Sequence, residues 1–98
     1  MQILWTHEAF QQLTAIEDYI SKDSPERAAD FINIMVERAE AIPDSPRMGR
    51  VVPEIVNPDI RVLIFKKYRI VYRLTEQRIE ILTLFEGHRL LRLDEIDV

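Results

Sequence analysis

The side chains with the clearest capacity for chemistry lie in a basic stretch in the middle of the chain. Residues 47–73 carry seven basic and two acidic side chains, a net charge of +5, whereas residues 1–46 carry −6 and residues 74–98 carry −3. Guanidinium groups bind carboxylates and phosphates through paired hydrogen bonds. The stretch therefore predicts a surface that meets an acidic partner; the alternative is a chance clustering of charge on a solvated surface.

The composition argues against several other kinds of site. The 98 residues include no cysteine, which excludes disulfides and thiolate metal sites, and His7 and His88 lack the matched spacing of metal ligands. We therefore expect no metal and no cofactor. The N-terminus lacks the pattern of a signal peptide, and no apolar run approaches the roughly 20 residues that span a bilayer. We expect one cytoplasmic domain, residues 1–98, with no membrane partner.

A strand and two helices are the first elements that would position the basic stretch. Residues 2–5 predict a short strand, and Thr6 then suits the N-cap of a helix that runs to about Ser21. Ser24 and Pro25 mark the start of a second helix that runs to about Ala41. The short link predicts an antiparallel hairpin. The apolar positions expected to face the core are Phe10, Leu13, Ile16 and Ile20 in the first helix, and Ala28, Phe31, Ile32, Met35, Ala39 and Ile42 in and after the second.

The second half of the chain predicts strands. Residues 51–56 suggest a weak strand, which Pro53 would confine to an edge. Residues 60–65, 68–75 and 79–85 are rich in β-branched and aromatic side chains, and the short polar links between them indicate an antiparallel meander. The order βααββββ predicts an α+β fold of two layers: an N-terminal strand, an α-helical hairpin and a mostly antiparallel β-sheet.

Strand alternation assigns the two faces of this sheet. One face is expected to cover the helices. The assignment assumes a three-residue link around Lys66 between the strands on either side of it, because a register slip of one residue would move each side chain to the other face. The residues assigned to the helix-covered face are Ile60, Val62, Ile64, Ile70, Tyr72, Leu74, Ile79 and Ile81. Those assigned to the opposite face are Arg61, Leu63, Arg69, Val71, Arg73, Glu80, Leu82 and Leu84.

The opposite face mixes arginines with aliphatic side chains, so we expect a partner to cover it. Arg61 and Arg69 would repel one another around Val71 if both were unpaired, which favours a binding role. Arg73 is a further candidate contact, although it could instead form an ordinary cross-strand ion pair with Glu80.

Four segments, in this order and spacing, resemble one protein family. They are YISKDSPERAADFI (residues 19–32), SPRMGRVVPEI (residues 45–55), RVLIFKKYRIVYRL (residues 61–74) and IEILTLFEGHR (residues 79–89). Together they are similar to the ParE branch of the RelE/ParE superfamily, the toxins of type II toxin–antitoxin systems. The resemblance spans nearly the whole chain and implies the two-layer fold predicted above.

The resemblance also implies partners and a target. A cognate antitoxin, with a DNA-binding N-terminal dimer and an acidic C-terminal segment that folds on the toxin, would neutralise the protein; such a segment suits a basic, half-apolar sheet face. The ParE branch implies inhibition of DNA gyrase without catalysis. The expected contact residues for antitoxin or target are Arg61, Arg69, Arg73, Arg89, Leu90 and Leu93.

The ribonuclease branch of the superfamily, with RelE-like and YoeB-like mRNA endonucleases, is the alternative. Its members place a glutamate after a Gly-x-x-x-Pro element, an arginine in the next-to-last strand and a histidine past the last strand; Glu54, Arg69 and His88 match these positions. The set implies general acid–base catalysis with charge stabilisation. However, Arg89 stands where those nucleases place a tyrosine, and the net charge of −4 disfavours RNA binding. A third possibility is a degenerate, non-toxic module that only binds the antitoxin.

Overall fold

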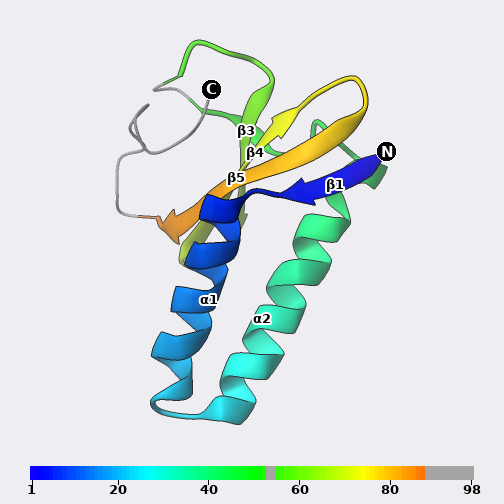
Figure 1. Ribbon diagram of the computed structural model, residues 1–98. Coiled ribbons are helices and arrows are strands. Elements are labelled where there is room, and N and C mark those ends of the chain that lie inside the picture. The colour runs from blue at the N-terminus through cyan, green and yellow to red at the C-terminus, as the bar shows by residue number, and fades with distance from the viewer. Residues whose placement is uncertain (53–54, 88–98) are drawn as a thin grey trace.

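A five-stranded sheet carries a helical hairpin on one face (Figure 1). The computed structural model describes residues 1–52 and 55–87. The elements are β1 (Gln2–Trp5), α1 (His7–Ser21), α2 (Pro25–Glu40), the 3-10 turn η1 (Ile42–Asp44), β2 (Arg50–Val51), β3 (Ile60–Phe65), β4 (Tyr68–Leu74) and β5 (Arg78–Glu86). The strand order is β1-β5-β4-β3-β2, with β1 parallel to β5 and the other pairs antiparallel. The α+β fold and the predicted element order are confirmed.

The two helices begin at the predicted caps. The Thr6 hydroxyl accepts a hydrogen bond from the Ala9 amide at 3.2 Å, and the Ser24 hydroxyl accepts one from the Arg27 amide at 3.2 Å. Thr6 also donates to the carbonyl oxygen of Ile81 at 2.7 Å, which ties the start of α1 to β5. One polar side chain thus both starts the helix and fixes it on the sheet.

The predicted apolar stripe of α1 is wrong at one position. Phe10 is 60% exposed, whereas the neighbouring Ala9 is fully buried. Ala9, Leu13, Ile16 and Ile20 form the stripe that packs on the sheet, with the spacing of a helix face, and Phe10 lies about 100° around the helix from Ala9. The α2 stripe is confirmed: Ala28, Met35, Ala39 and Ile42 are buried, and the half-buried Phe31 and Ile32 pack against the same core.

The first strand after the helices is shorter than predicted. β2 spans only Arg50–Val51 and pairs with Arg61 and Val62 of β3, so the predicted strand over residues 51–56 is wrong in extent. Its edge position is confirmed. Ile55 instead lies in a bend and is buried.

The assignment of β3 to the sheet faces is wrong because the β3–β4 link is one residue shorter than assumed. Phe65 pairs with Tyr68, so the loop contains only Lys66 and Lys67, and Lys66 adopts a left-handed backbone with φ 53°. Leu63 and Phe65 consequently pack on the helix side. Ile60, Val62 and Ile64 point to the opposite face, which we call the outer face.

The register shift between β4 and β5 corrects a second assignment. Val71 pairs with Thr83 and Tyr72 with Ile81, so Leu82 is an extra residue in β5. A bulge of this kind reverses the alternation beyond it. Ile79 and Ile81 face the helices as predicted, but Leu84 joins them there rather than lying on the outer face.

Candidate functional site

The outer face, predicted to be half-apolar and free for a partner, carries a second apolar cluster. Each member is at most 7% exposed: Val52, Ile55, Ile60, Val62, Val71, Leu82 and Phe85. Val52 and Ile55 come from the segment after β2, which therefore contributes to this cluster. We expected a partner to cover the aliphatic side chains of this sheet, but other residues of the same chain already bury them.

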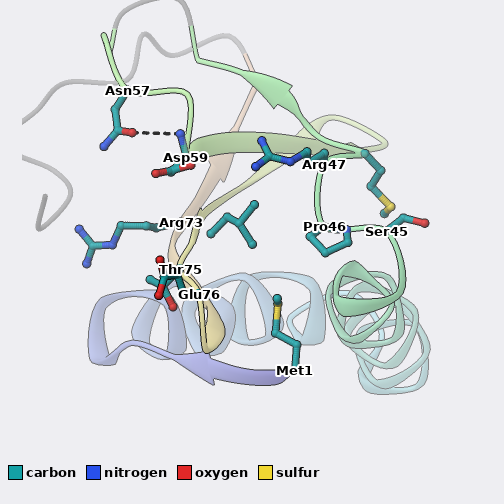
Figure 2. Close-up of a pocket in the computed structure, with 11 residues that line it drawn as sticks. Met1, Ser45, Pro46, Arg47, Asn57, Asp59, Arg73, Thr75 and Glu76 are labelled. Carbon is teal, nitrogen blue, oxygen red and sulfur yellow. Dashed lines mark hydrogen bonds between the residues drawn. The ribbon is translucent and has the colours of Figure 1, made fainter.

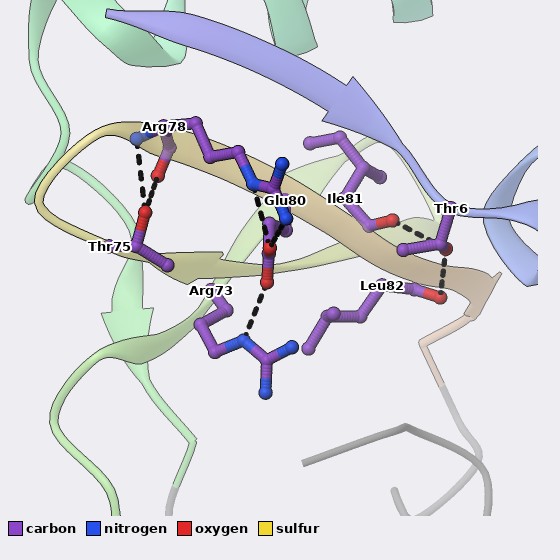
Figure 3. Close-up of polar contacts among 7 residues, drawn as sticks. All are labelled: Thr6, Arg73, Thr75, Arg78, Glu80, Ile81 and Leu82. Atoms are coloured by element: carbon purple, nitrogen blue, oxygen red, sulfur yellow. Dashed lines mark hydrogen bonds and ion pairs between the residues drawn. The ribbon is translucent and has the colours of Figure 1, made fainter.

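One predicted arginine on the outer face is held by an ion pair. Arg73 and Glu80 are direct cross-strand partners, and Arg73 Nε donates to Glu80 Oε1 at 2.7 Å (Figure 3). Arg78 contacts the other carboxylate oxygen through Nη2 at 2.7 Å and Nε at 2.9 Å. The hydrogen bond from Arg73, reinforced by Arg78, holds the pKa of Glu80 below its ordinary value although burial opposes this. The alternative interpretation of Arg73 as half of a sheet ion pair is confirmed.

Arg61 holds a loop and does not lie beside Arg69 on the outer face. Its Nη1 donates to the carbonyl oxygens of Gly49 at 2.9 Å and Arg47 at 3.3 Å. Its Nε is buried and has no hydrogen-bond partner among the residues that the structure describes. The prediction that Arg61 and Arg69 repel one another across Val71 is therefore wrong, because Arg61 pairs with Tyr72 in the register and bends toward the loop.

Tyr72 fixes the same loop from within the core. The Gly49 amide donates to the Tyr72 hydroxyl at 3.0 Å, and that hydroxyl donates to the Pro46 carbonyl oxygen at 2.8 Å. Burial raises the pKa of Tyr72, against smaller opposing effects of the Gly49 hydrogen bond and of Arg61. A Cβ at Gly49 would lie 2.6 Å from the Tyr72 hydroxyl and 2.9 Å from the Val62 carbonyl oxygen, so only glycine fits here.

Among the predicted arginines that the structure describes, Arg69 alone has no hydrogen bond or ion pair to any residue in 1–52 or 55–87. It is half-buried and lies between Ile64 of β3 and Phe85 of β5 in the register. Its Nε would be 3.3 Å from a Cβ at Gly87, so its side chain runs along the end of β5. Glu54, His88, Arg89, Leu90 and Leu93 lie outside the described residues, as do residues 53–54 and 88–98 generally. Arg69 is thus the single member of the proposed nuclease set that the structure places.

A groove of about 910 Å³ opens beside the loop held by Tyr72 and Arg61. Figure 2 shows the residues around it, which come from residues 45–48, the turn at residues 57–59, the β4–β5 turn and Met1. The side chains of Arg47 and Arg73 are balanced by those of Asp59 and Glu76, so the lining side chains carry no net charge. The residues described include no group of three or more histidine, aspartate or glutamate side chains suited to hold a metal ion.

A second groove, of about 560 Å³, lies between α1 and the ends of β4 and β5. Its lining is mostly apolar: Ala15, Ile16, Tyr19, Tyr68, Leu84 and Phe85, with Gln12 and Glu86. Beside this groove, Phe31, Phe65 and Tyr68 form an aromatic cluster. The ammonium groups of Lys66 and Lys67 lie over the rings of this cluster. From the sequence, Lys66 and Lys67 were expected only to form a polar link between two strands; the aromatic residues on either side of them, Phe65 and Tyr68, were the signal for this cluster.

Comparison with known proteins places this geometry in a family. Residues 3–91 match the family model described as the ParE toxin of the type II toxin–antitoxin system, parDE. A solved structure titled as the chromosomal ParDE TA system from P. aeruginosa contains a similar chain, with a TM-score of 0.73 and 26% identity over 88% of this chain and 95% of that one. No curated protein matches the sequence. None of the described helices is long and apolar enough to cross a membrane.

Proposed function

Since the chain belongs to the ParE toxin family of type II toxin–antitoxin systems, we propose that it inhibits DNA gyrase by binding and without catalysis of its own. It is a ParE-like toxin with a cognate antitoxin as partner. We propose further that both act in the cytoplasm, and that the antitoxin combines a DNA-binding N-terminal dimer with an acidic C-terminal segment that covers the toxin.

The observation that carries the proposal is the family match over residues 3–91, and the net charge of the chain supports it. A net charge of −4 disfavours RNA, whose binding depends on neutralising many phosphates. Arg73 is engaged by Glu80 and Arg61 by two backbone carbonyls, but Arg69, the arginine of the alternative nuclease set, is not engaged by any described residue, so the arginines do not decide between the two functions.

The proposed target contacts are the residues that the sequence predicted. Arg69 would contribute directly, together with Arg89, Leu90 and Leu93 near the C-terminus. Arg61 and Arg73 would act by fixing the loop before β2 and the pairing of β4 with β5, because their guanidinium groups already have partners in the chain.

A gyrase cleavage assay tests the proposal. Purified toxin is incubated with gyrase, ATP and supercoiled plasmid, and linear DNA released from trapped cleavage complexes is measured. We expect wild type, Glu54→Gln and His88→Gln to trap complexes equally, because proton transfer is not needed. Leu90→Ser with Leu93→Ser should abolish trapping. Glu76→Gln, a change in an exposed turn, is the matched control for Glu54→Gln.

Two other results would replace the proposal. Cleavage of mRNA, alone or on ribosomes, that disappears in Glu54→Gln and His88→Gln would establish the endonuclease alternative; a general acid or base typically contributes about 10²–10⁴-fold in rate. Antitoxin binding with neither gyrase trapping nor RNA cleavage would establish a non-toxic binding module.

A further inference from the structure

Three cations surround the aromatic cluster at the end of the sheet where β3 turns into β4. Lys66 Nζ lies 5.7 Å from the ring centroid of Phe31 and 5.8 Å from that of Phe65. The Arg38 guanidinium, from α2, lies 5.6 Å from the Phe65 centroid, and Lys67 Nζ lies 5.8 Å from that of Tyr68. We call Arg38, Lys66 and Lys67 the cationic tip.

The cationic tip keeps its charge available. Cation–π contacts position a cation without neutralising it. Both ion pairs formed within residues 1–52 and 55–87 involve Glu80, so no carboxylate in that part of the chain pairs with Arg38, Lys66 or Lys67. All three residues are exposed. A local positive charge thus stands on a protein whose net charge is −4.

The backbone conformation at Lys66 is a second indication that its side chain has a function. Its φ of 53° is the left-handed conformation, which glycine, asparagine and aspartate adopt at lower cost than lysine. The chain nevertheless has lysine there, with the ammonium held over two rings. An unfavoured backbone conformation at a positioned, unpaired cation points to binding rather than to stability.

The apolar groove beside α1 continues from the cationic tip. Tyr68 belongs to both: its ring lies under Lys67 and also lines the groove with Tyr19 and Leu84. Tyr19 is 67% exposed, so its ring is open to contact with a partner. Glu86 also lines the groove, so a carboxylate placed there would be repelled and one placed at the tip attracted.

We propose that the groove and the cationic tip together bind one acidic, amphipathic peptide segment of the antitoxin. Its apolar side chains occupy the groove between Tyr19, Tyr68 and Leu84, and its carboxylates meet the tip. This inference rests on the proposed neutralisation by an acidic antitoxin segment, and it moves that segment from the outer face to the end of the sheet. Nucleic acid fits less well, because cations already cover the ring faces on which bases would stack.

Fluorescence anisotropy with a synthetic peptide of alternating glutamate and leucine, added to the full chain, tests the site. Lys66→Gly removes one cation, and glycine accepts the left-handed backbone, so the fold should survive. Lys67→Gln removes another cation. We expect each change to weaken binding about two- to fivefold and the double variant to weaken it more than either single change, and the loss should shrink at high salt. Arg47→Gln, the same kind of change at the other groove, is the matched control and should have no effect.

A comparison of two peptides tests the apolar groove separately from the cationic tip. Tyr19→Ser should weaken binding of the glutamate–leucine peptide and leave binding of polyglutamate unchanged. Three results would overturn the proposal: equal weakening by Arg47→Gln, which would mean unspecific attraction; no effect of Lys66→Gly and Lys67→Gln; or tighter binding of a single-stranded oligonucleotide with the same dependence on both lysines. None of these measurements involves gyrase, so a failure of the proposed target leaves their outcome unaffected.

Discussion

Removing the Tyr72 hydroxyl should destabilise the protein by loosening the loop before β2. Tyr72 is fully buried, and its hydroxyl connects the Gly49 amide to the Pro46 carbonyl oxygen. Tyr72→Phe keeps the ring and its packing but leaves both backbone groups without that partner. The change therefore isolates the contribution of two hydrogen bonds that cross 23 and 26 residues of sequence.

The expected size follows from the burial of the two groups. A net hydrogen bond contributes about 0.5–1.5 kcal/mol, and a buried group left unpaired costs about 1–3 kcal/mol. The Gly49 amide belongs to a buried residue, whereas Pro46 is half-buried and its carbonyl oxygen can regain water. We therefore expect a loss of about 1.5–3 kcal/mol in the free energy of unfolding. For a domain of this size, each kcal/mol lowers Tm by about 4–8 °C.

Urea and thermal unfolding, followed by circular dichroism, measure this loss. Tyr68→Phe is the matched control, because Tyr68 is also buried but its hydroxyl has no hydrogen bond to the described residues; it should change stability by less than about 0.5 kcal/mol. Equal losses in the two variants would show that loss of a tyrosine hydroxyl in general, and not of the two loop hydrogen bonds, accounts for the effect. A loss below about 0.5 kcal/mol in Tyr72→Phe would refute the reasoning.

Two further predictions concern charge and packing. The arginines hold the pKa of Glu80 below its ordinary value near 4.5, so its contribution to stability is present above about pH 4.5 and is lost as pH falls below that value. Glu80→Gln should therefore cost about 1.5–3 kcal/mol near neutral pH, and urea midpoints of variant and wild type should converge in acid; a constant difference across this range would contradict the pairing. Phe31→Ala should lower the free energy of unfolding by about 2–4 kcal/mol, because the centroid of its ring lies 5.3 Å from that of Phe65 and 5.4 Å from that of Tyr68. Phe10→Ala, at a site that is 60% exposed, should be nearly neutral in the same melts.

The helical half of the fold could be predicted because its signals are local. Thr6, Ser24 and Pro25 act within one turn of the chain, and the structure places both helix starts where those residues indicate. Strand positions were similarly local, since β-branched and aromatic runs define β3, β4 and β5 to within one residue at each end. Such patterns need no knowledge of the rest of the molecule.

The sheet faces could not be predicted with the same success because they depend on counts of one residue. The β3–β4 loop contains two residues where three were assumed, and the bulge at Leu82 changes the alternation of β5. Neither feature has a strong sequence signal: Lys66 occupies a left-handed position that would ordinarily suggest glycine or asparagine. The pairing of Arg73 with Glu80 was foreseeable from a turn, but the acceptors of Arg61 are loop carbonyls, which no side-chain pattern reveals.

The basic stretch of residues 47–73 is therefore not one patch in the folded protein. Glu80 holds Arg73 at the β4–β5 end of the sheet, Arg61 is tied to the loop before β2, and Lys66 and Lys67 extend from the opposite end of β4 beside Arg38. Arg38 comes from the acidic N-terminal half of the sequence and Lys66 and Lys67 from the basic stretch, so folding brings together cations that the charge profile separates. An acidic partner that binds one of these basic sites and not the others must contact the apolar side chains around the site as well as its charge. The groove between Tyr19 and Leu84 supplies an apolar surrounding at the tip, where no described carboxylate pairs with the cations, so neutralisation should depend on the Lys66–Lys67 turn more than on the arginines of the strands.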